Sequence, residues 1–180
     1  MTDTWVALLR GINVGGHGKI EMATLRRILA ARGLRAVETH IQSGNVVFRA
    51  SGQGAEALAA LISQSLAREL GAPPVTLVLG AADFARIVAA APAADDPKTV
   101  NLFFLADPAA AVDRAALEAL RAPTEALIYA TGAIYLSASA GIGRSKLAAA
   151  LERHVACAVT ARNLRSARQI AHLAREVAER

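Results

Sequence analysis

Apolar residues in the first part of the chain follow two spacings, one typical of strands and one of helices. Trp5 to Leu9 is apolar at every position, which predicts a strand covered on both faces. Two short strands join tightly at Ser43-Gly44, a hairpin signal. In order, we predict a strand over 5–9, a helix from Met22 to Leu29, strands over 37–42 and 45–49, a helix from Leu58 to near Gly71 and a strand over 75–79. This β-α-β-β-α-β order is that of the ferredoxin-like fold.

The same order recurs later in the chain, after a helix over 82–91 and a segment rich in turn residues. The predicted elements are a strand over 100–105, a helix over 112–120, strands over 127–130 and 134–137, a helix over 147–155, a short strand over 158–160 and a trailing helix over 164–177. Residues 41–48 resemble residues 129–136, an offset within about 85–90 residues that indicates a duplicated unit.

The predicted fold class is therefore α+β, with two ferredoxin-like halves. We expect the halves at residues 1–92 and 99–180, with a linker at 93–98. Sheets whose strands are apolar on both faces need cover on both sides. We therefore expect the halves to pack into one compact body, and a homodimer is a further way to cover a sheet face.

The predicted topology places the glycine-rich loop after the first strand next to another connection of the same sheet. In this fold, the first strand-to-helix loop and the hairpin between the second and third strands leave the sheet at the same end. Residues 10–19 should therefore lie beside residues 42–45. In the second half, residues 141–146 lead into a helix and residues 160–163 follow the last strand, again at one end of a sheet.

Glycines, cations and helix starts together favour anion binding, because such loops expose backbone N–H groups. If the two sheet ends meet where the halves join, they form one composite site. The residues expected to bind the anion are Arg10, Gly11, Asn13, Gly15, Gly16, Lys19, Gln42, Ser43, Gly44, Asn45, Gly143, Arg144, Ser145, Lys146, Arg162 and Asn163. The cations supply charge, and the three asparagines orient polar groups of the ligand.

The distribution of charged residues suggests nucleic-acid binding as an alternative function. The formal net charge is +5, and residues 126–175 hold seven Lys and Arg against one acid, Glu152. A basic surface of this kind attracts phosphates, including those of nucleic acids. Base stacking on the sheet is disfavoured because aromatic residues make up 4% of the chain. We therefore keep three hypotheses open: a small anionic ligand, a nucleic-acid backbone, and a scaffold without ligand.

Other classes of protein are excluded or receive little support. The loops lack the glycine spacing of a P-loop or of a dinucleotide-binding fingerprint. The histidines are scattered, so we expect no metal site, and no motif calls for a cofactor. The sequence presents no recognisable catalytic constellation, which favours a binding protein and leaves enzyme activity open. One cysteine, no signal-peptide pattern and no membrane-spanning apolar run predict a cytoplasmic protein with no membrane partner.

Four motifs carry a resemblance to a known family. These are Leu-Leu-Arg-Gly-Ile-Asn-Val-Gly-Gly at 8–16, Ile-Gln-Ser-Gly-Asn-Val-Val-Phe at 41–48, Gly-Arg-Ser-Lys-Leu at 143–147 and Thr-Ala-Arg-Asn at 160–163. The chain resembles the bacterial family called domain of unknown function 1697. The resemblance implies paired ferredoxin-like halves and no established activity, cofactor or catalytic residue. Leu164 stands where members usually carry Trp, and Gln169 stands near a usual Lys.

Overall fold

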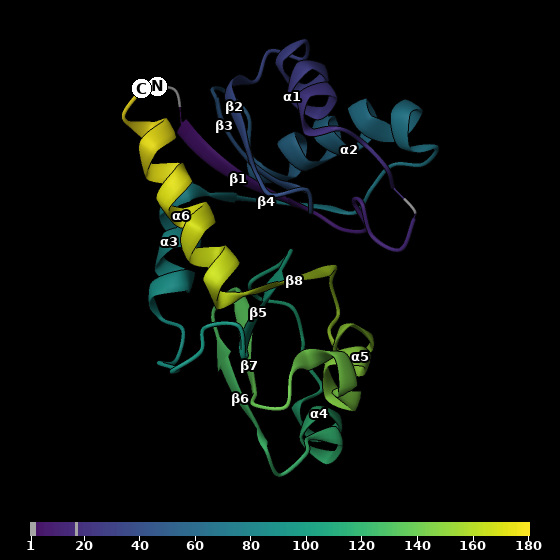
Figure 1. Cartoon of the computed structure of the whole chain (residues 1–180), viewed down its shortest axis with the longest axis vertical. Coiled ribbons are helices and arrows are strands. Elements are labelled where there is room, and N and C mark those ends of the chain that lie inside the picture. Colours follow the sequence, from purple (N-terminus) through teal and green to yellow (C-terminus); the bar gives the residue numbers. More distant parts are fainter. Residues whose placement is uncertain (1–2, 17) are drawn as a thin grey trace. The chain divides into compact units, whose positions relative to one another are not determined.

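A computed structural model describes residues 3–16 and 18–180 of the chain. The first half contains four strands and two helices in the predicted order, followed by a third helix (Figure 1). Its elements are β1 (Asp3–Leu9), α1 (Met22–Ala30), β2 (Arg35–His40), β3 (Asn45–Ala50), α2 (Ala55–Leu70), β4 (Thr76–Gly80) and α3 (Ala81–Ala89).

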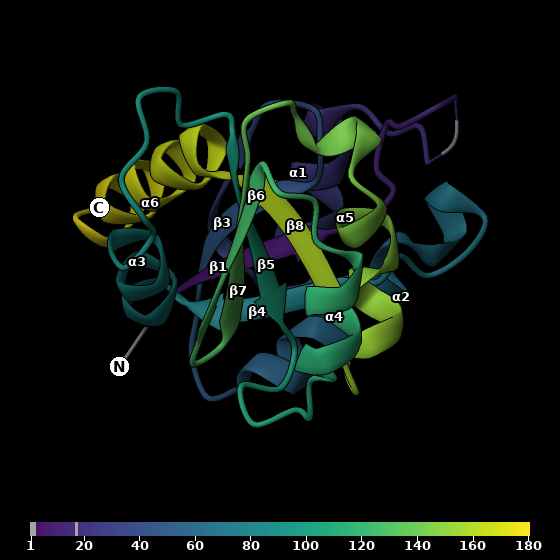
Figure 2. The same cartoon turned by 90° about the horizontal axis from the view of Figure 1, so that it is seen from below.

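The second half repeats this order and ends in a long helix. Its elements are β5 (Val100–Leu105), α4 (Arg114–Leu120), β6 (Glu125–Ala130), β7 (Ala133–Ala138), α5 (Lys146–Ala150), β8 (Val159–Asn163) and α6 (Leu164–Ala178), with short 3-10 turns at Ile142–Arg144 and Leu151–His154. Helices α4 and α5 lie side by side in both views (Figure 2).

The two sheets have the same strand order. The first runs β2-β3-β1-β4 and the second β6-β7-β5-β8, with every neighbouring pair antiparallel. In each, the first and third strands of the unit are central, which is the ferredoxin-like arrangement. The predicted α+β class and the repeat of one topology are confirmed.

Contacts divide the chain into two units. One comprises Met1–Ala85 together with Gln169–Arg180, and the other comprises Arg86–Arg168. The division therefore falls within α3 and α6, and the end of α6 groups with the first sheet. Arg180 supports this grouping, since it donates to the Glu38 carboxylate of β2 at 2.8 Å.

The core of the first unit forms where β1 and β3 meet α1 and α2. Val6 to Leu9 of β1 are all buried, as the unbroken apolar run predicts. Ala7, Leu9 and Phe48 lie in one apolar cluster with residues of both helices, whose stripes keep the helical spacing. Helix α2 ends at Gly71, whose φ of +79° is the left-handed conformation that glycine adopts without strain.

The second unit has its own core, built between β5–β8 and helices α4 and α5. Phe103, Ile134 and Leu136 of the central strands pack with Leu117 of α4 and Leu147 of α5. Burying each such side chain stabilises the fold by about 1.5–3 kcal/mol. Each sheet thus uses one face to pack the helices of its own unit.

Several predicted elements differ in their bounds from those of the structure. The strand predicted over 37–42 is β2 (Arg35–His40), because Ile41 takes a φ of +49° and begins the turn. The helix predicted over 147–155 breaks after Ala150 into a 3-10 turn. Val155 is extended there, and it forms a β-bridge with Val112.

Residues 160–163 were expected to follow the last strand. In the structure they form most of that strand. β8 pairs with β5 from Leu105↔Val159 to Asn101↔Asn163. Because β8 ends in the polar residues Arg162 and Asn163, the apolar pattern does not predict its full length. Two other starts also move: α4 begins at Arg114, after Asp113 caps it by accepting from the N–H of Ala116 at 3.0 Å, and β6 begins at Glu125.

Helices that could span a membrane are absent from the described part of the chain, since none is both long and apolar enough.

Candidate functional site

The glycine-rich loop and the β2–β3 hairpin meet at one end of the first sheet, as predicted. The N–H of Leu9 donates to the carbonyl of Gly44 at 2.8 Å, where β1 gives way to the loop. The side-chain nitrogen of Asn13 donates to the backbone carbonyl of Gln42 at 2.9 Å. The start of β4 reaches the same end, since the N–H of Arg10 donates to the carbonyl of Val75 at 2.9 Å.

Asn13 holds the loop in shape. Its side-chain nitrogen also donates to the carbonyl of Ile20 at 3.0 Å, and its side-chain oxygen accepts from the N–H of Ile20 at 2.9 Å. Its φ of +54° is left-handed, a conformation that Asn tolerates better than most residues. Asn13 therefore closes the loop onto itself and ties it to the hairpin.

Asn45 has the same kind of role inside the hairpin. It is fully buried. Its side-chain nitrogen donates to the backbone carbonyl of His40 at 3.1 Å and to the Ser43 hydroxyl at 2.9 Å. Burial also lowers the pKa of His40 below its usual 6.5, because a buried imidazole is costly to charge. The side chain of Asn45 thus sets the hairpin's shape from beneath the surface.

The glycines of this region fall into two groups. A Cβ at Gly18 would strike the carbonyl oxygen of Gly11, and one at Gly44 would lie 2.9 Å from both Leu9 and Ile12. Packing therefore requires these two. Gly11, Gly15 and Gly16 have positive φ and open space around them. Within the described residues, the backbone N–H groups of Gly15 and Gly16 make no hydrogen bond.

Cationic side chains border this exposed backbone. Arg10 and Lys19 are both exposed, one at each end of the loop. Within the described residues, no carboxylate lies within ion-pair distance of Lys19. Exposed apolar side chains also lie here: Val14 is 61% exposed and Ile41 is 55% exposed. His17, one of the scattered histidines, lies outside the described residues.

The second half brings its own predicted residues to one end of its sheet. Asn163 at the end of β8 is the register partner of Asn101 at the start of β5. The loop after β7 begins there as well, where the N–H of Gly141 donates to the carbonyl of Ala138 at 2.9 Å. Residues 141–146 and the end of β8 therefore share this sheet end, as predicted.

Several polar groups at this end cap helices. The Ser145 hydroxyl accepts from the N–H of Ala148 at 2.9 Å, at the start of α5. The Asn163 side-chain oxygen accepts from the N–H of Ser166 at 2.8 Å, at the start of α6. Gly143, Arg144 and Lys146 remain exposed. The residues that can face a ligand are therefore the glycine and the two cations.

Arg162 differs from the other predicted cations because it is largely buried. Its guanidinium donates to the carbonyl of Ala161 at 2.7 Å and to the Thr160 hydroxyl at 3.2 Å. Burial lowers the pKa of Arg162 to about 10, which still leaves it charged at neutral pH.

Asn101 is a further polar residue of this half, and the sequence motifs do not include it. It is 5% exposed, and its buried side-chain nitrogen has no hydrogen-bond partner among the described residues. An unsatisfied buried amide is costly, and such groups are uncommon in folded proteins. The available signal was one polar residue within the otherwise apolar strand Val-Asn-Leu-Phe-Phe-Leu.

Metal ligands do not gather in the described part of the chain, where no group of three or more His, Cys, Asp or Glu side chains could hold an ion.

The fold and these sheet ends define a protein of paired ferredoxin-like halves, each with glycines and cations in its connections. A family model described as "Protein of unknown function (DUF1697)" matches residues 1–135. The chain belongs to this family, as its motifs predict. The motifs at 143–147 and 160–163 lie beyond the matched residues.

A solved structure is similar over nearly the whole chain. It is that of the conserved bacterial protein SP0830 from Streptococcus pneumoniae, with 25% sequence identity and a TM-score of 0.76. The match covers 97% of this chain and 99% of the streptococcal one. No curated protein matches the chain.

Proposed function

We propose that this protein binds a small phosphorylated or otherwise anionic molecule, using the loop of residues 10–19 in its first half. The observation that carries the proposal is how the loop is built. Asn13 joins it to the hairpin, while Gly15, Gly16 and Lys19 are exposed. Backbone N–H groups held in a turn form concavities that suit anions, and a nearby cation adds charge.

The second half offers a further surface of the same chemistry. Arg144 and Lys146 are exposed around Gly143, and the N-terminus of α6 begins at the same sheet end. A helix N-terminus carries partial positive charge, which adds to that of the cations. We propose that this surface also binds an anion.

We further propose that the protein works in the bacterial cytoplasm. Cys157 is the chain's single cysteine, so no internal disulfide would be lost in a reducing compartment.

The three lysines of the chain allow a matched test. Lys19 and Lys146 lie in the proposed surfaces, whereas Lys98 is exposed in the segment before β5. We would measure thermal shifts of the full chain with inorganic phosphate, nucleotides and sugar phosphates. A ligand at 100 times its dissociation constant should stabilise the fold by about 2.7 kcal/mol.

Substitution then decides whether the proposed surfaces are responsible. Lys19→Ala and Lys146→Ala should weaken binding of the best anion, while Lys98→Ala, with the same loss of charge, should leave it unchanged. The proposal fails if no anion shifts the unfolding temperature. It also fails if Lys98→Ala weakens binding as much as the other two.

A second candidate function rests on α6. Arg165, Arg168 and Arg175 are exposed along this helix, while Leu164, Ala167, Ile170, Ala174 and Val177 are buried. This basic stripe suits the backbone of a nucleic acid. Binding to short RNA should then weaken steeply with salt, and Arg165→Ala should reduce the salt slope by about 1. A small-anion site would instead respond to Lys19→Ala.

A further inference from the structure

β6 is an edge strand with unusually little protection. It lies at one edge of the order β6-β7-β5-β8 and reads Glu-Ala-Leu-Ile-Tyr-Ala. Ala126 and Ala130 are exposed, and Ile128 is 46% exposed. Its one charged residue, Glu125, is only 8% exposed. An apolar edge without charge is a template for pairing with another strand.

Hairpin geometry shows which backbone groups point outward from this edge. Thr131 and Gly132 form a two-residue turn, which Ala130 and Ala133 flank as register partners. The flanking pair of such a turn is hydrogen-bonded, so alternate residues of β6 bond to β7. The N–H and C=O groups of Leu127 and Tyr129 therefore point away from the sheet.

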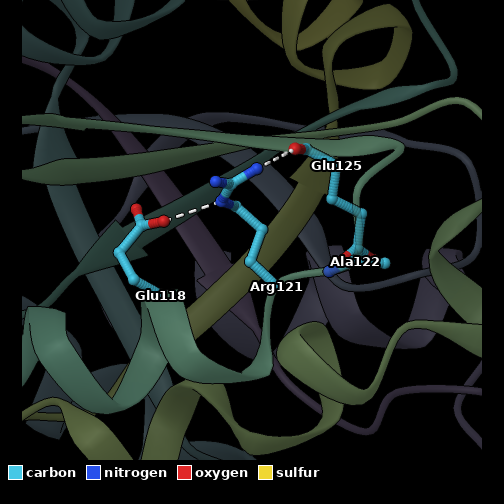
Figure 3. Close-up of polar contacts among 4 residues, drawn as sticks. All are labelled: Glu118, Arg121, Ala122 and Glu125. Carbon is cyan, nitrogen blue, oxygen red and sulfur yellow. Dashed lines mark hydrogen bonds and ion pairs between the residues drawn. The ribbon is translucent and has the colours of Figure 1, made fainter.

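The contacts of Glu125 agree with this assignment and close one end of the edge. The N–H of Glu125 donates to the carbonyl of Ala122 at 2.9 Å, away from β7. Its own carbonyl accepts from the Arg121 guanidinium at 2.9 Å (Figure 3). Glu118 holds Arg121 in place through a 2.6 Å ion pair. Among the described residues, the edge is therefore occupied at Glu125 and open from Ala126 to Ala130.

The equivalent strand of the first half shows what protection looks like. β2 holds the same edge position in the order β2-β3-β1-β4. It carries Arg35 and Glu38, its pairing with β3 is irregular between these two residues, and Ala36 has a φ of +47°. Charges and bulges are devices that keep edges from pairing. β6 pairs with β7 in regular register over all six residues and has neither device.

We propose that β6 pairs antiparallel with β6 of a second copy of this chain, about a twofold axis at Ile128. In this register Leu127 lies opposite the partner's Tyr129, and the outward N–H and C=O groups of both residues are satisfied in both copies. Ile128 lies opposite the partner's Ile128 as a non-hydrogen-bonded pair, with Cα atoms about 4.5 Å apart. A second copy is the occupant that fits, because two uncharged edges meet without like-charge repulsion. The two four-stranded sheets become one sheet of eight strands.

The size of this interface sets the expected affinity. A standard interface buries about 800 Å² on each partner, and a five-residue strand edge supplies less. The dimer should therefore be reversible and concentration-dependent. This proposal goes beyond anion binding and does not depend on it, since neither sheet end takes part.

Sedimentation equilibrium of the full chain tests the proposal first. The apparent mass should rise with concentration from that of the 18.7 kDa chain toward twice that value. Ile128→Lys places two like charges on the twofold axis and should weaken association by about tenfold or more. Val75→Lys is the matched control, since Val75 is 38% exposed and lies at an end of the other sheet. A wild-type chain that stays monomeric up to millimolar concentration overturns the proposal, as does equal weakening by both variants.

Cross-linking tests the register. In a Cys157→Ser background, Ile128→Cys places two thiols opposite each other on the axis, and mild oxidation should yield a covalent dimer. Val75→Cys in the same background should not. If the chain dimerises but Ile128→Cys does not cross-link, the interface lies elsewhere and the proposed pairing is wrong.

Discussion

Replacing Asn13 by Gly is the sharpest test of how the glycine-rich loop is held. The substitution removes three hydrogen bonds, two donated to the carbonyls of Ile20 and Gln42 and one accepted from the N–H of Ile20. Glycine tolerates the φ of +54° at this position, so no backbone strain is added. The loss of stability therefore reports the hydrogen bonds, together with the greater backbone entropy that glycine gives the unfolded chain.

The expected magnitude follows from those three bonds. Each contributes about 0.5–1.5 kcal/mol net, and the partly exposed carbonyls can turn to water, which favours the lower part of the range. We expect Asn13→Gly to lower the free energy of unfolding by about 2 kcal/mol. Asn13→Ala should cost about 1 kcal/mol more, because a Cβ is strained at this φ.

Urea unfolding provides the assay, and the chain contains its own reporter. Trp5 is the single tryptophan and packs against the first core from β1, so its fluorescence follows the half that contains the loop. Gln42→Ala is the control, since Gln42 accepts through its backbone carbonyl and truncating its side chain should change little. A loss below about 0.5 kcal/mol for Asn13→Gly, with an unchanged denaturant slope, would refute the assigned role of this side chain.

Three further outcomes are expected. Gly18→Ala should lower the free energy of unfolding in urea by more than about 2 kcal/mol, because its Cβ meets the Gly11 carbonyl. Gly15→Ala has open space around its Cβ and should lower it by about 1 kcal/mol. Equal losses for the two variants would contradict the packing argument. Tyr135→Phe should cost about 1–2 kcal/mol because its buried hydroxyl donates to a backbone carbonyl at 2.8 Å, whereas Tyr129→Phe should cost almost nothing because its buried hydroxyl lacks a partner among the described residues. The lowered pKa of His40 means that the folded state resists protonation, so the free energy of unfolding falls as the pH drops through 6.5 and below. The variant His40→Gln should reduce that fall. An NMR titration midpoint of His40 at or above 6.5 would contradict this prediction.

The candidate site was predictable in its location more than in its roles. The order of strands and helices placed residues 10–19 beside residues 42–45, and the Asn13–Gln42 hydrogen bond confirms that neighbourhood. The sequence pattern predicts that Asn13, Asn45 and Asn163 orient a ligand. In the structure, their side chains bond to the protein's own backbone and, for Asn45, to a serine hydroxyl. Residue type shows that an amide can donate and accept, but the partner it finds depends on how the chain folds around it.

The sequence by itself determined the topology of this protein, because apolar spacing and turn residues act within a few neighbours along the chain. The unbroken apolar run of β1, the stripes of α1 and α2 and the hairpin turns were all readable in this way. Tertiary structure decided what depends on partners distant in sequence. Pairing with β5 drew Arg162 and Asn163 into β8, and the bridge between Val112 and Val155 ended a helix early. The glycine-rich loop shows both levels, since its glycines permit many shapes and the contacts of Asn13 and Gly44 select one.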